Sequence, residues 1–338
     1  MRLEHDADLT RLNTFGVRAR TAVLAQFSSL DELRGLLAAP ELKQRPRLVL
    51  GGGSNVLFTR DWPGVVLLNE IPGIALERED EEHVWLRSGA GVVWNDLVMY
   101  TVERGWGGIE NLSLIPGKVG AAPMQNIGAY GVELKDTFSA LEALRLEDGA
   151  VVEFHAAECR FGYRESFFKH EGRDRFIITS LTLRLKKHGA PNTAYGAIRD
   201  VLAERGITDP TVRDVSEAVM NIRRSKLPDP AELGNAGSFF KNPMVPMAQA
   251  EALRRKHPGL VSYPAPGGLV KVAAGWLIEQ AGWKGRYSGA CGVHQDQALV
   301  LVNRGGASGQ AIYDLSEQVL RSVWDRFGIA LEREVNII

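Results

Sequence analysis

Residues 114–131 have the sequence LIPGKVGAAPMQNIGAYG, which is apolar and yet rich in glycine and proline. The stretch is too apolar for a solvated linker, and its prolines and glycines argue against a long helix. Ordered loops of this irregular kind are often functional. Glycine also allows the backbone to turn sharply or to approach another group closely. We therefore expect a folded loop that carries part of a binding site.

A second glycine-rich loop precedes this stretch in the chain. A predicted strand at 47–50 leads into Gly51-Gly52-Gly53-Ser54-Asn55, and apolar runs at 56–58 and 65–68 follow, separated by a turn at 62–64. The loop joins strand to strand, so it is not a Rossmann fingerprint, which would open a helix. Successive glycine N–H groups can form a concave nest for phosphate. A tight strand connection explains the same residues equally well.

The remaining chain shows strands and helices without a regular β-α-β alternation, so we predict an α+β fold. Ser29 and Glu32 have capping-box spacing before a helical stripe at Leu33, Leu36 and Leu37. Helices are predicted at 95–104, along a stripe from Val212 to Ile222, and at 272–280 and 308–327. Strands are predicted at 144–146 and 151–154, which form a hairpin, and at 176–185, 298–303 and 331–335. Residues 187–209 are expected to form a boundary region.

Composition excludes several classes of protein. The 338 residues hold 40 Lys+Arg against 41 Asp+Glu, so bulk charge does not attract nucleic acid or a membrane surface. Two cysteines exclude a disulfide framework, and the seven histidines are scattered, so no metal site is expected. The charged start lacks the apolar core of a signal peptide, and no apolar run is long enough to span a membrane. These features predict a cytoplasmic protein.

Three further groups of polar residues are candidates for chemistry. Gln125 and Asn126 offer amides that suit the edge of a flavin or nucleotide ring, although such amides often satisfy their own buried loop. Arg164, beside Tyr163, can clamp a carboxylate or phosphate in bidentate fashion, although most arginines form weak surface ion pairs. Ser238 follows a glycine but lies in no nucleophile elbow, so it is either a proton donor or a turn residue.

These stretches together resemble the UDP-N-acetylenolpyruvoylglucosamine reductases, flavoenzymes of bacterial cell-wall precursor synthesis. The resemblance runs nearly from end to end. It is carried, in order, by 13–16 (NTFG), 51–57 (GGGSNVL), 115–117 (IPG), 125–133 (QNIGAYGVE), 159–166 (CRFGYRES), 226–228 (KLP), 235–243 (NAGSFFKNP), 273–278 (AAGWLI) and 331–335 (LEREV). Tyr195-Gly196 resembles the type in this family that keeps an extra tyrosine-bearing loop. Single motifs of this length are weak, but so many in one order are specific.

The resemblance implies a fold and a reaction. The implied fold is a vanillyl-alcohol-oxidase (PCMH) type FAD-binding domain of two subdomains, with a separate α+β substrate-binding domain. We place the subdomains at 1–70, rejoined by 329–338, and at 71–208, and the substrate domain at 209–328. The implied reaction passes hydride from NADPH to non-covalently bound FAD, and then to the enolpyruvyl group of the UDP sugar, giving UDP-N-acetylmuramate for peptidoglycan.

The resemblance also implies roles for residues. Arg164 and a protonated Glu334 would stabilise the enolate-like intermediate, and Ser238 would protonate its α-carbon. The substrate would contact Tyr163, Tyr195, Lys226, Asn242 and Gln297. The segments that match the FAD site contain Gly51, Gly52, Gly53, Ser54, Asn55, Pro116, Gly117, Gly120, Gln125, Asn126, Gly128, Ala129 and Tyr130.

Two other readings stay open on the sequence alone. One is another FAD-dependent oxidase of the same fold; many of those attach flavin to His or Cys, and no histidine lies in the two loops. The other is a non-catalytic regulator that binds a nucleotide sugar or flavin, which would not need a proton donor. The expected partner is a small UDP sugar, with no nucleic acid and no membrane, and the expected state is a monomer.

Overall fold

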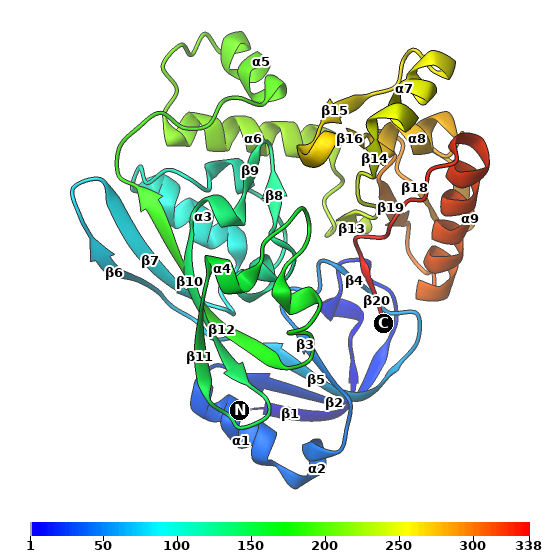
Figure 1. The fold of residues 1–338 in the computed structure, drawn as a ribbon. Coiled ribbons are helices and arrows are strands. Elements are labelled where there is room, and N and C mark those ends of the chain that lie inside the picture. Colours follow the sequence, from blue (N-terminus) through cyan, green and yellow to red (C-terminus); the bar gives the residue numbers. More distant parts are fainter. Residues whose placement is uncertain (1) are drawn as a thin grey trace. The chain divides into compact units, whose positions relative to one another are not determined.

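The computed structural model describes residues 2–338, which form two compact units (Figure 1). Of the described residues, the first unit contains 2–7, 21–52 and 63–225. The second contains residues 8–20, 53–62 and 226–338. Each unit is therefore assembled from separate parts of the chain. The finer division into three segments proposed from the sequence stays a prediction.

A small sheet in the first unit has the strand order β1-β2-β5-β3. Its strands are β1 (Arg2–Asp8), β2 (Arg20–Phe27), β5 (Trp62–Asn69) and β3 (Arg47–Leu50), and β3 runs parallel to β5. Helices α1 (Leu30–Ala38) and α2 (Pro40–Lys43) lie beside this sheet in Figure 1. Leu33, Leu36 and Leu42 pack with Phe27 and Val65 in one apolar cluster. The Ser29 hydroxyl accepts a hydrogen bond from Glu32 N at 3.2 Å, as the capping-box spacing predicts.

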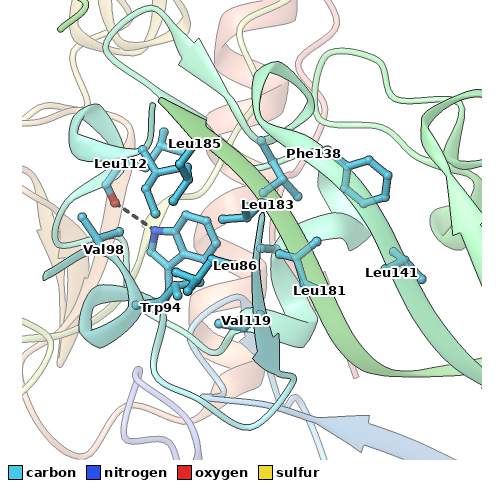
Figure 2. Packing of buried hydrophobic residues seen from close by; sticks show 14 of the residues in the cluster. Leu86, Trp94, Val98, Leu112, Val119, Phe138, Leu141, Leu181, Leu183 and Leu185 are labelled. Carbon is cyan, nitrogen blue, oxygen red and sulfur yellow. Dashed lines mark hydrogen bonds between the residues drawn. The ribbon is translucent and has the colours of Figure 1, made fainter. Parts of the chain in front are cut away.

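A five-stranded sheet in the first unit has the order β11-β10-β12-β7-β6, with every neighbouring pair antiparallel. Its strands are β6 (Ile74–Glu79), β7 (His83–Gly89), β10 (Phe138–Arg145), β11 (Val151–His155) and β12 (Phe176–Lys186). One face packs on α3 (Trp94–Glu103) and on the 3-10 helix η3 (Val119–Gln125). Figure 2 shows Trp94 in this core, with its indole N–H donating to Leu112 O at 3.0 Å.

Shorter elements surround this sheet. They are the 3-10 helices η2 (Glu110–Leu112), η4 (Leu134–Asp136) and η5 (Phe167–Lys169), helix α4 (Ala156–Cys159), and the paired strands β8 (Gly128–Ala129) and β9 (Val132–Glu133). Two helices end the unit, α5 (Gly196–Glu204) and α6 (Val212–Lys226), whose last residue belongs to the second unit. Ile198 and Leu202 of α5 pack against Val215 and Val219 of α6.

The second unit contains two small sheets. One has the order β13-β19-β18-β17, from β13 (Gly234–Ser238), β19 (Val300–Asn303), β18 (Cys291–Val293) and β17 (Tyr287–Ser288). The other has the order β14-β16-β15, from β14 (Met244–Pro246), β16 (Leu269–Val272) and β15 (Ser262–Pro264). Its helices are α7 (Met247–Lys256), α8 (Ala274–Gln280) and α9 (Gly309–Phe327), with 3-10 helices η1 (Thr10–Leu12) and η6 (Pro266–Gly268).

Most predicted elements are confirmed, two predictions are wrong, and one helix is shorter than predicted. The expected turn at 62–64 is the start of β5, where Val65 N bonds Pro46 O. Helix α5 lies within 187–209, whose role as a boundary stays a prediction. The helix predicted at 272–280 begins at Ala274, since Val272 ends β16. The last strand is β20 (Asn336–Ile337) rather than 331–335, because Asn336 pairs with Val56 of β4 (Val56–Leu57). The α+β class itself is confirmed.

No helix within residues 2–338 is both long enough and apolar enough to cross a bilayer.

Candidate active site

Arg164 stands at the tip of a tight turn in the first unit. Gly162 and Glu165 exchange backbone hydrogen bonds of 3.0 and 3.3 Å, which leaves Tyr163 and Arg164 at the tip. Arg164 has a φ of +57°, a conformation that costs free energy outside glycine. Its Nη2 donates to Gly128 O at 2.6 Å. The guanidinium is therefore held against the strand β8.

The hydrogen bond from Arg164 to the carbonyl of residue 128 requires glycine at that position. A Cβ at this position would lie 3.1 Å from Arg164 Nη1, 2.9 Å from Glu133 Cγ and 3.0 Å from Val132 O. Gly128 and Ala129 pair with Glu133 and Val132 across a turn in which Tyr130 and Gly131 have φ of +50° and +81°. Two successive positive φ angles are typical of a type I′ hairpin turn. The hairpin therefore places the backbone of Gly128, which carries no side chain, next to Arg164.

Asn126 orders the same loop from inside. It is fully buried, with a φ of +44°. Its Nδ2 donates to Gly162 O at 2.9 Å and to Glu133 Oε2 at 3.0 Å, and its Oδ1 accepts from Lys135 N at 3.0 Å. Its amide thus connects the β8–β9 hairpin to the Arg164 turn. Any contribution of Asn126 to ligand binding therefore acts through the loop that it orders.

The two glycine-rich segments meet within the first unit. A Cβ on Gly52 would lie 2.9 Å from Gly117 Cα, so only glycine permits this approach. A Cβ on Gly51 would lie 3.5 Å from the Cβ of Lys118. Lys118 Nζ in turn pairs with Glu70 Oε1 at 2.5 Å and donates to Asn69 O at 3.1 Å. The end of β3 and the start of the 114–131 stretch are therefore fastened together beside the end of β5.

Further along, η3 runs close to the five-stranded sheet. Gly120 N donates to Ala90 O at 2.9 Å, and a Cβ on Gly120 would lie 2.7 Å from the Cβ of Ala90. Pro116 is exposed, while Gln125 and Ala129 are half-buried. The predicted cofactor residues between 116 and 130 thus belong to one continuous segment whose backbone is closely packed.

In the second unit, Gly53, Ser54 and Asn55 lie beside the end of the chain. Gly53 has a φ of +61°, and its carbonyl accepts from Thr14 N at 3.1 Å. Asn55 Nδ2 donates to Glu334 O at 3.3 Å, and Asn336 N donates to Asn55 O at 3.1 Å. The glycine loop and the predicted catalytic Glu334 are therefore neighbours, although 279 residues separate Asn55 from Glu334.

Ser238 lies next to the same terminal segment. Glu334 N donates to Phe239 O at 2.8 Å, and Phe240 pairs with Arg333. Ser238 ends β13 after an irregularity in its pairing with β19, where Gly237 has a φ of +67°. Its side chain is half-buried, and no group within residues 2–338 hydrogen-bonds its hydroxyl. The second unit therefore brings two of the three predicted catalytic residues together.

Two predicted substrate residues meet at the start of α8. Asn242 Oδ1 accepts from Ala274 N at 2.9 Å. Gln297 Oε1 would lie 3.4 Å from a Cβ on Gly275. Lys226, at the end of α6, is exposed. Nearby, Lys241 is almost fully buried and pairs with Glu332 at 2.5 Å.

Tyr195 and Tyr130 meet in the first unit. Their rings are edge-on, with centroids 5.2 Å apart and an interplanar angle of 90°. Arg223, which the motif analysis missed, hydrogen-bonds Tyr130, and burial lowers the pKa of Arg223 and raises that of Tyr130. Asn111, also missed, donates from Nδ2 to Tyr130 O at 3.0 Å and to Asn192 O at 2.9 Å. Helical spacing places Arg223 on α6, but nothing local in the sequence indicates its partner.

No group of three or more His, Cys, Asp and Glu side chains in residues 2–338 is arranged to hold a metal ion.

Comparison with known proteins assigns the family. Residues 21–155 match the FAD binding domain, and residues 229–338 match the C-terminal domain of UDP-N-acetylenolpyruvoylglucosamine reductase. The reductase of Burkholderia pseudomallei (strain 1710b) is 53% identical over 331 residues, which cover 97% of this chain and 95% of that protein. The chain belongs to the UDP-N-acetylenolpyruvoylglucosamine reductase family.

Two further reductases support the assignment. The reductase of Burkholderia orbicola (strain MC0-3) is 52% identical over the same 97% of the chain. The crystal structure of the reductase from Thermus caldophilus matches with a TM-score of 0.66 at 26% identity, covering 100% of this chain and 99% of that one. The expected fold, an FAD-binding domain with a separate C-terminal domain, is confirmed.

The residues present fit FAD. Within residues 2–338, no acceptor is found for the backbone N–H groups of Gly52 and Gly53, which suits the phosphate oxygens of a dinucleotide. Gly52 packs against the backbone of Gly117, and Gly120 packs against Ala90, so neither position has room for a side chain. The backbone is therefore closely packed in the segments that match the FAD site. FAD is accordingly the cofactor of this reductase family member, while the role of each residue stays a prediction.

Proposed function

We propose that the protein reduces the enolpyruvyl group of UDP-N-acetyl-3-O-(1-carboxyvinyl)-glucosamine, giving UDP-N-acetylmuramate for peptidoglycan synthesis. NADPH is the proposed source of electrons, and the reaction takes place in the cytosol. The observation that carries the proposal is the Arg164 guanidinium, fixed at 2.6 Å from Gly128 O beside a hairpin of the FAD-binding domain. A guanidinium at this place suits a substrate that bears a carboxylate next to the bond to be reduced.

When bound, FAD supplies the hydride that adds to the terminal carbon of the vinyl group. Negative charge then develops on the α-carbon and is shared with its carboxylate. In our proposal Arg164 binds that carboxylate and stabilises the charge. Its backbone conformation and its bond to Gly128 hold the side chain in place before the substrate arrives, so little reorganisation is needed during the reaction.

Glu334 assists in the proposal as a protonated hydrogen-bond donor to the same charge. The half-buried Glu334 is anchored through its backbone N–H to Phe239 O and through its carbonyl to Asn55. Both bonds involve the main chain, and they fix the position of Glu334 beside Phe239 and Asn55. This supports a role in which the carboxyl group acts on the substrate.

Ser238 is the proposed proton donor to the α-carbon. The hydroxyl bonds no other group within residues 2–338. A serine hydroxyl is a weak acid in water, but transfer to a carbanion-like carbon is favourable once charge has developed there. The proton added by Ser238 and the hydride together saturate the double bond, and the serine regains its proton from solvent.

Tyr163, Tyr195, Lys226, Asn242 and Gln297 are the proposed contacts of the UDP sugar. We further infer that NADPH and the UDP sugar bind in alternation, which gives ping-pong kinetics. The proposed contacts of Asn242 and Gln297 are supported by their position, since the side chains of both lie beside the start of α8.

The decisive experiment follows NADPH oxidation by the purified yellow protein under anaerobic conditions, with and without the enolpyruvyl UDP sugar. We expect oxidation that depends on the sugar, with UDP-N-acetylmuramate as product. Acid precipitation is expected to release the flavin into the supernatant. Absence of sugar-dependent turnover would reject the proposed reaction, and retained colour in the pellet would favour an oxidase with attached flavin.

A further inference from the structure

Lys241 is a buried cation to which the proposed reaction gives no role. It lies in the segment that follows Ser238, and its side chain is only 7% exposed. Its Nζ pairs with Glu332 Oε1 at 2.5 Å, whereas the Glu332 side chain is 69% exposed. Removing a charge from water without an opposite charge nearby is costly, so a buried ammonium needs such a partner. Glu332 therefore serves as a counter-charge for Lys241.

Lys241 and Glu334 lie on one face of a short antiparallel ladder. Lys241 N donates to Glu332 O at 2.9 Å. Glu334 N donates to Phe239 O at 2.8 Å. Because side chains alternate between the two faces of a ladder, Lys241 shares a face with Glu332, which is opposite, and with Glu334, which is diagonal to it. Diagonal neighbours are about 7–8 Å apart, within reach of a long side chain, so the charge of Lys241 can act on both carboxyl groups.

The other charged groups beside Glu334 have different surroundings. Arg333 faces the opposite side of the ladder, where its guanidinium pairs with Glu317 of α9. The loop that also packs on Glu334 contributes the neutral amide of Asn55. Of the two cations in the ladder, Lys241 is therefore the one that shares a face with Glu334.

We propose that Glu332 is a positioning residue that neutralises the buried Lys241 and thereby allows Glu334 to hold a proton and donate it in a hydrogen bond to the substrate. The inference rests on the proposed function, in which Glu334 is a protonated donor. An opposite charge within about 4–6 Å lowers the pKa of a carboxyl group by about 1–3 units. Without Glu332, the charge of Lys241 would act on Glu334 alone and favour its ionised form.

The test follows the Glu334 carboxyl group of the oxidised holoenzyme by ¹³C NMR during a pH titration, with the signal assigned through Glu334→Gln. Glu332→Gln removes the counter-charge and keeps the size of the side chain. It should lower the titration midpoint of Glu334 by at least about one pH unit. Lys241→Met removes the cation and keeps the apolar stem, so the negative charge of Glu332 is no longer neutralised and the midpoint should rise.

Two further variants separate this effect from a general change in charge or packing. Glu317→Gln is the matched control, because Glu317 is 50% exposed and pairs with Arg333 on the other face of the ladder. It should leave the midpoint of Glu334 unchanged. The double variant of Lys241→Met with Glu332→Gln removes both charges and should return the midpoint close to the wild-type value.

Oxidation of the reduced flavin by the enolpyruvyl UDP sugar, followed by stopped flow, gives a second readout. This half-reaction requires the protonated form of Glu334 in our proposal, so its rate should fall as the pH rises through the midpoint. In Glu332→Gln the fall should begin at a lower pH. Flavin reduction by NADPH should keep its wild-type pH dependence.

Three results would overturn the inference: an unchanged midpoint in Glu332→Gln, an equal shift in Glu317→Gln, or a lower midpoint in Lys241→Met. If Glu332→Gln does not fold, the direction of the shift in Lys241→Met decides. The titration requires no turnover. A wild-type protein that fails to reduce the enolpyruvyl sugar would therefore reject the proposed function, while the midpoints of the variants would still test the effect of Glu332 on Glu334.

Discussion

Three residues that build the candidate site have strained backbone conformations. Asn126, Tyr130 and Arg164 all have positive φ angles, between +44° and +57°. Such conformations cost free energy of order 1 kcal/mol or more each in residues that bear a Cβ. Hydrogen bonds to Gly162, from Asn111 and to Gly128 hold the three residues in place. The fold thus tolerates a loss of stability at these positions, and in return the β8–β9 hairpin and Arg164 have fixed conformations.

The contact between Gly128 and Arg164 makes a sharp mutational prediction. Gly128→Ala places a methyl group 3.1 Å from Arg164 Nη1 and 3.0 Å from Val132 O, so the guanidinium has to move. We expect sugar-dependent kcat/KM to fall at least tenfold, with less than a threefold change in the rate of flavin reduction by NADPH. Stopped-flow measurement of the two half-reactions checks this.

Gly162→Ala is the control, because its Cβ would meet only Glu165 Cβ at 3.4 Å, an ordinary contact. It should leave both half-reactions within twofold of the wild type. Equal losses in the two glycine variants would mean that neither the hairpin nor the Arg164 turn tolerates an added methyl group, and that the contact between Gly128 and Arg164 is not the specific cause.

Ser238 gives a second prediction at this scale. Ser238→Ala removes the proposed proton donor, so reduction of the sugar should fall at least a hundredfold while flavin reduction by NADPH persists. Ser308→Ala is the control: Ser308 Oγ accepts from Ala311 N at 3.2 Å at the start of α9. Its loss should cost about 1 kcal/mol of stability and spare both half-reactions. A matching loss of both half-reactions in Ser238→Ala would assign the serine to cofactor binding or structure.

At the scale of elements, Lys118 joins three segments of the FAD-binding domain. Its side chain is only 12% exposed, its ammonium pairs with Glu70, and its stem lies beside Gly51. Lys118→Met keeps the stem and releases Glu70, which frees the 114–131 stretch from β5. We expect a three- to tenfold weaker FAD affinity, measured by quenching of flavin fluorescence during reconstitution of the apoprotein.

Lys187→Met provides the comparison. Lys187 follows β12 in the same unit, and its side chain is 22% exposed. It pairs at 2.6 Å with Glu79, the last residue of the edge strand β6. Loss of this pair should lower stability by roughly 0.5–1 kcal/mol and leave FAD affinity unchanged. If both variants weakened FAD binding equally, the effect would come from general loosening and not from the Lys118 contact.

The elements also show what the sequence alone can predict. Helices α6 and α9 were predictable because their apolar residues recur with helical spacing over long stretches. The position of β20 was not, since its pairing depends on Val56, 280 residues away. Likewise, the motif predicted Arg164 as a clamp, but its contact with Gly128 depends on a turn 36 residues earlier. Arg223 was missed because its partner Tyr130 lies in another motif.

At the scale of the whole molecule, the proposed function draws residues from both units. Arg164, Tyr195 and the 116–130 segment belong to the first, and Ser238, Asn242, Gln297 and Glu334 to the second.

Each unit also contains one of the two cysteines, Cys159 and Cys291, and both are buried. Burial raises the pKa of Cys159 to about 12 and raises that of Cys291. Burial therefore disfavours the thiolate form of both cysteines in the folded protein.

These thiols report the opening of each unit separately. Because a thiolate is the reactive form, iodoacetamide at pH 8.5 should label each cysteine only when its unit opens, as quantified by mass spectrometry. FAD should slow labelling of both, since its predicted contacts include Gly52 in the first unit and Gly53 in the second. Addition of UDP to the holoenzyme should protect Cys291 further, through Asn242 and Gln297. If UDP left the labelling of Cys291 unchanged, the proposed contacts with Asn242 and Gln297 would be rejected.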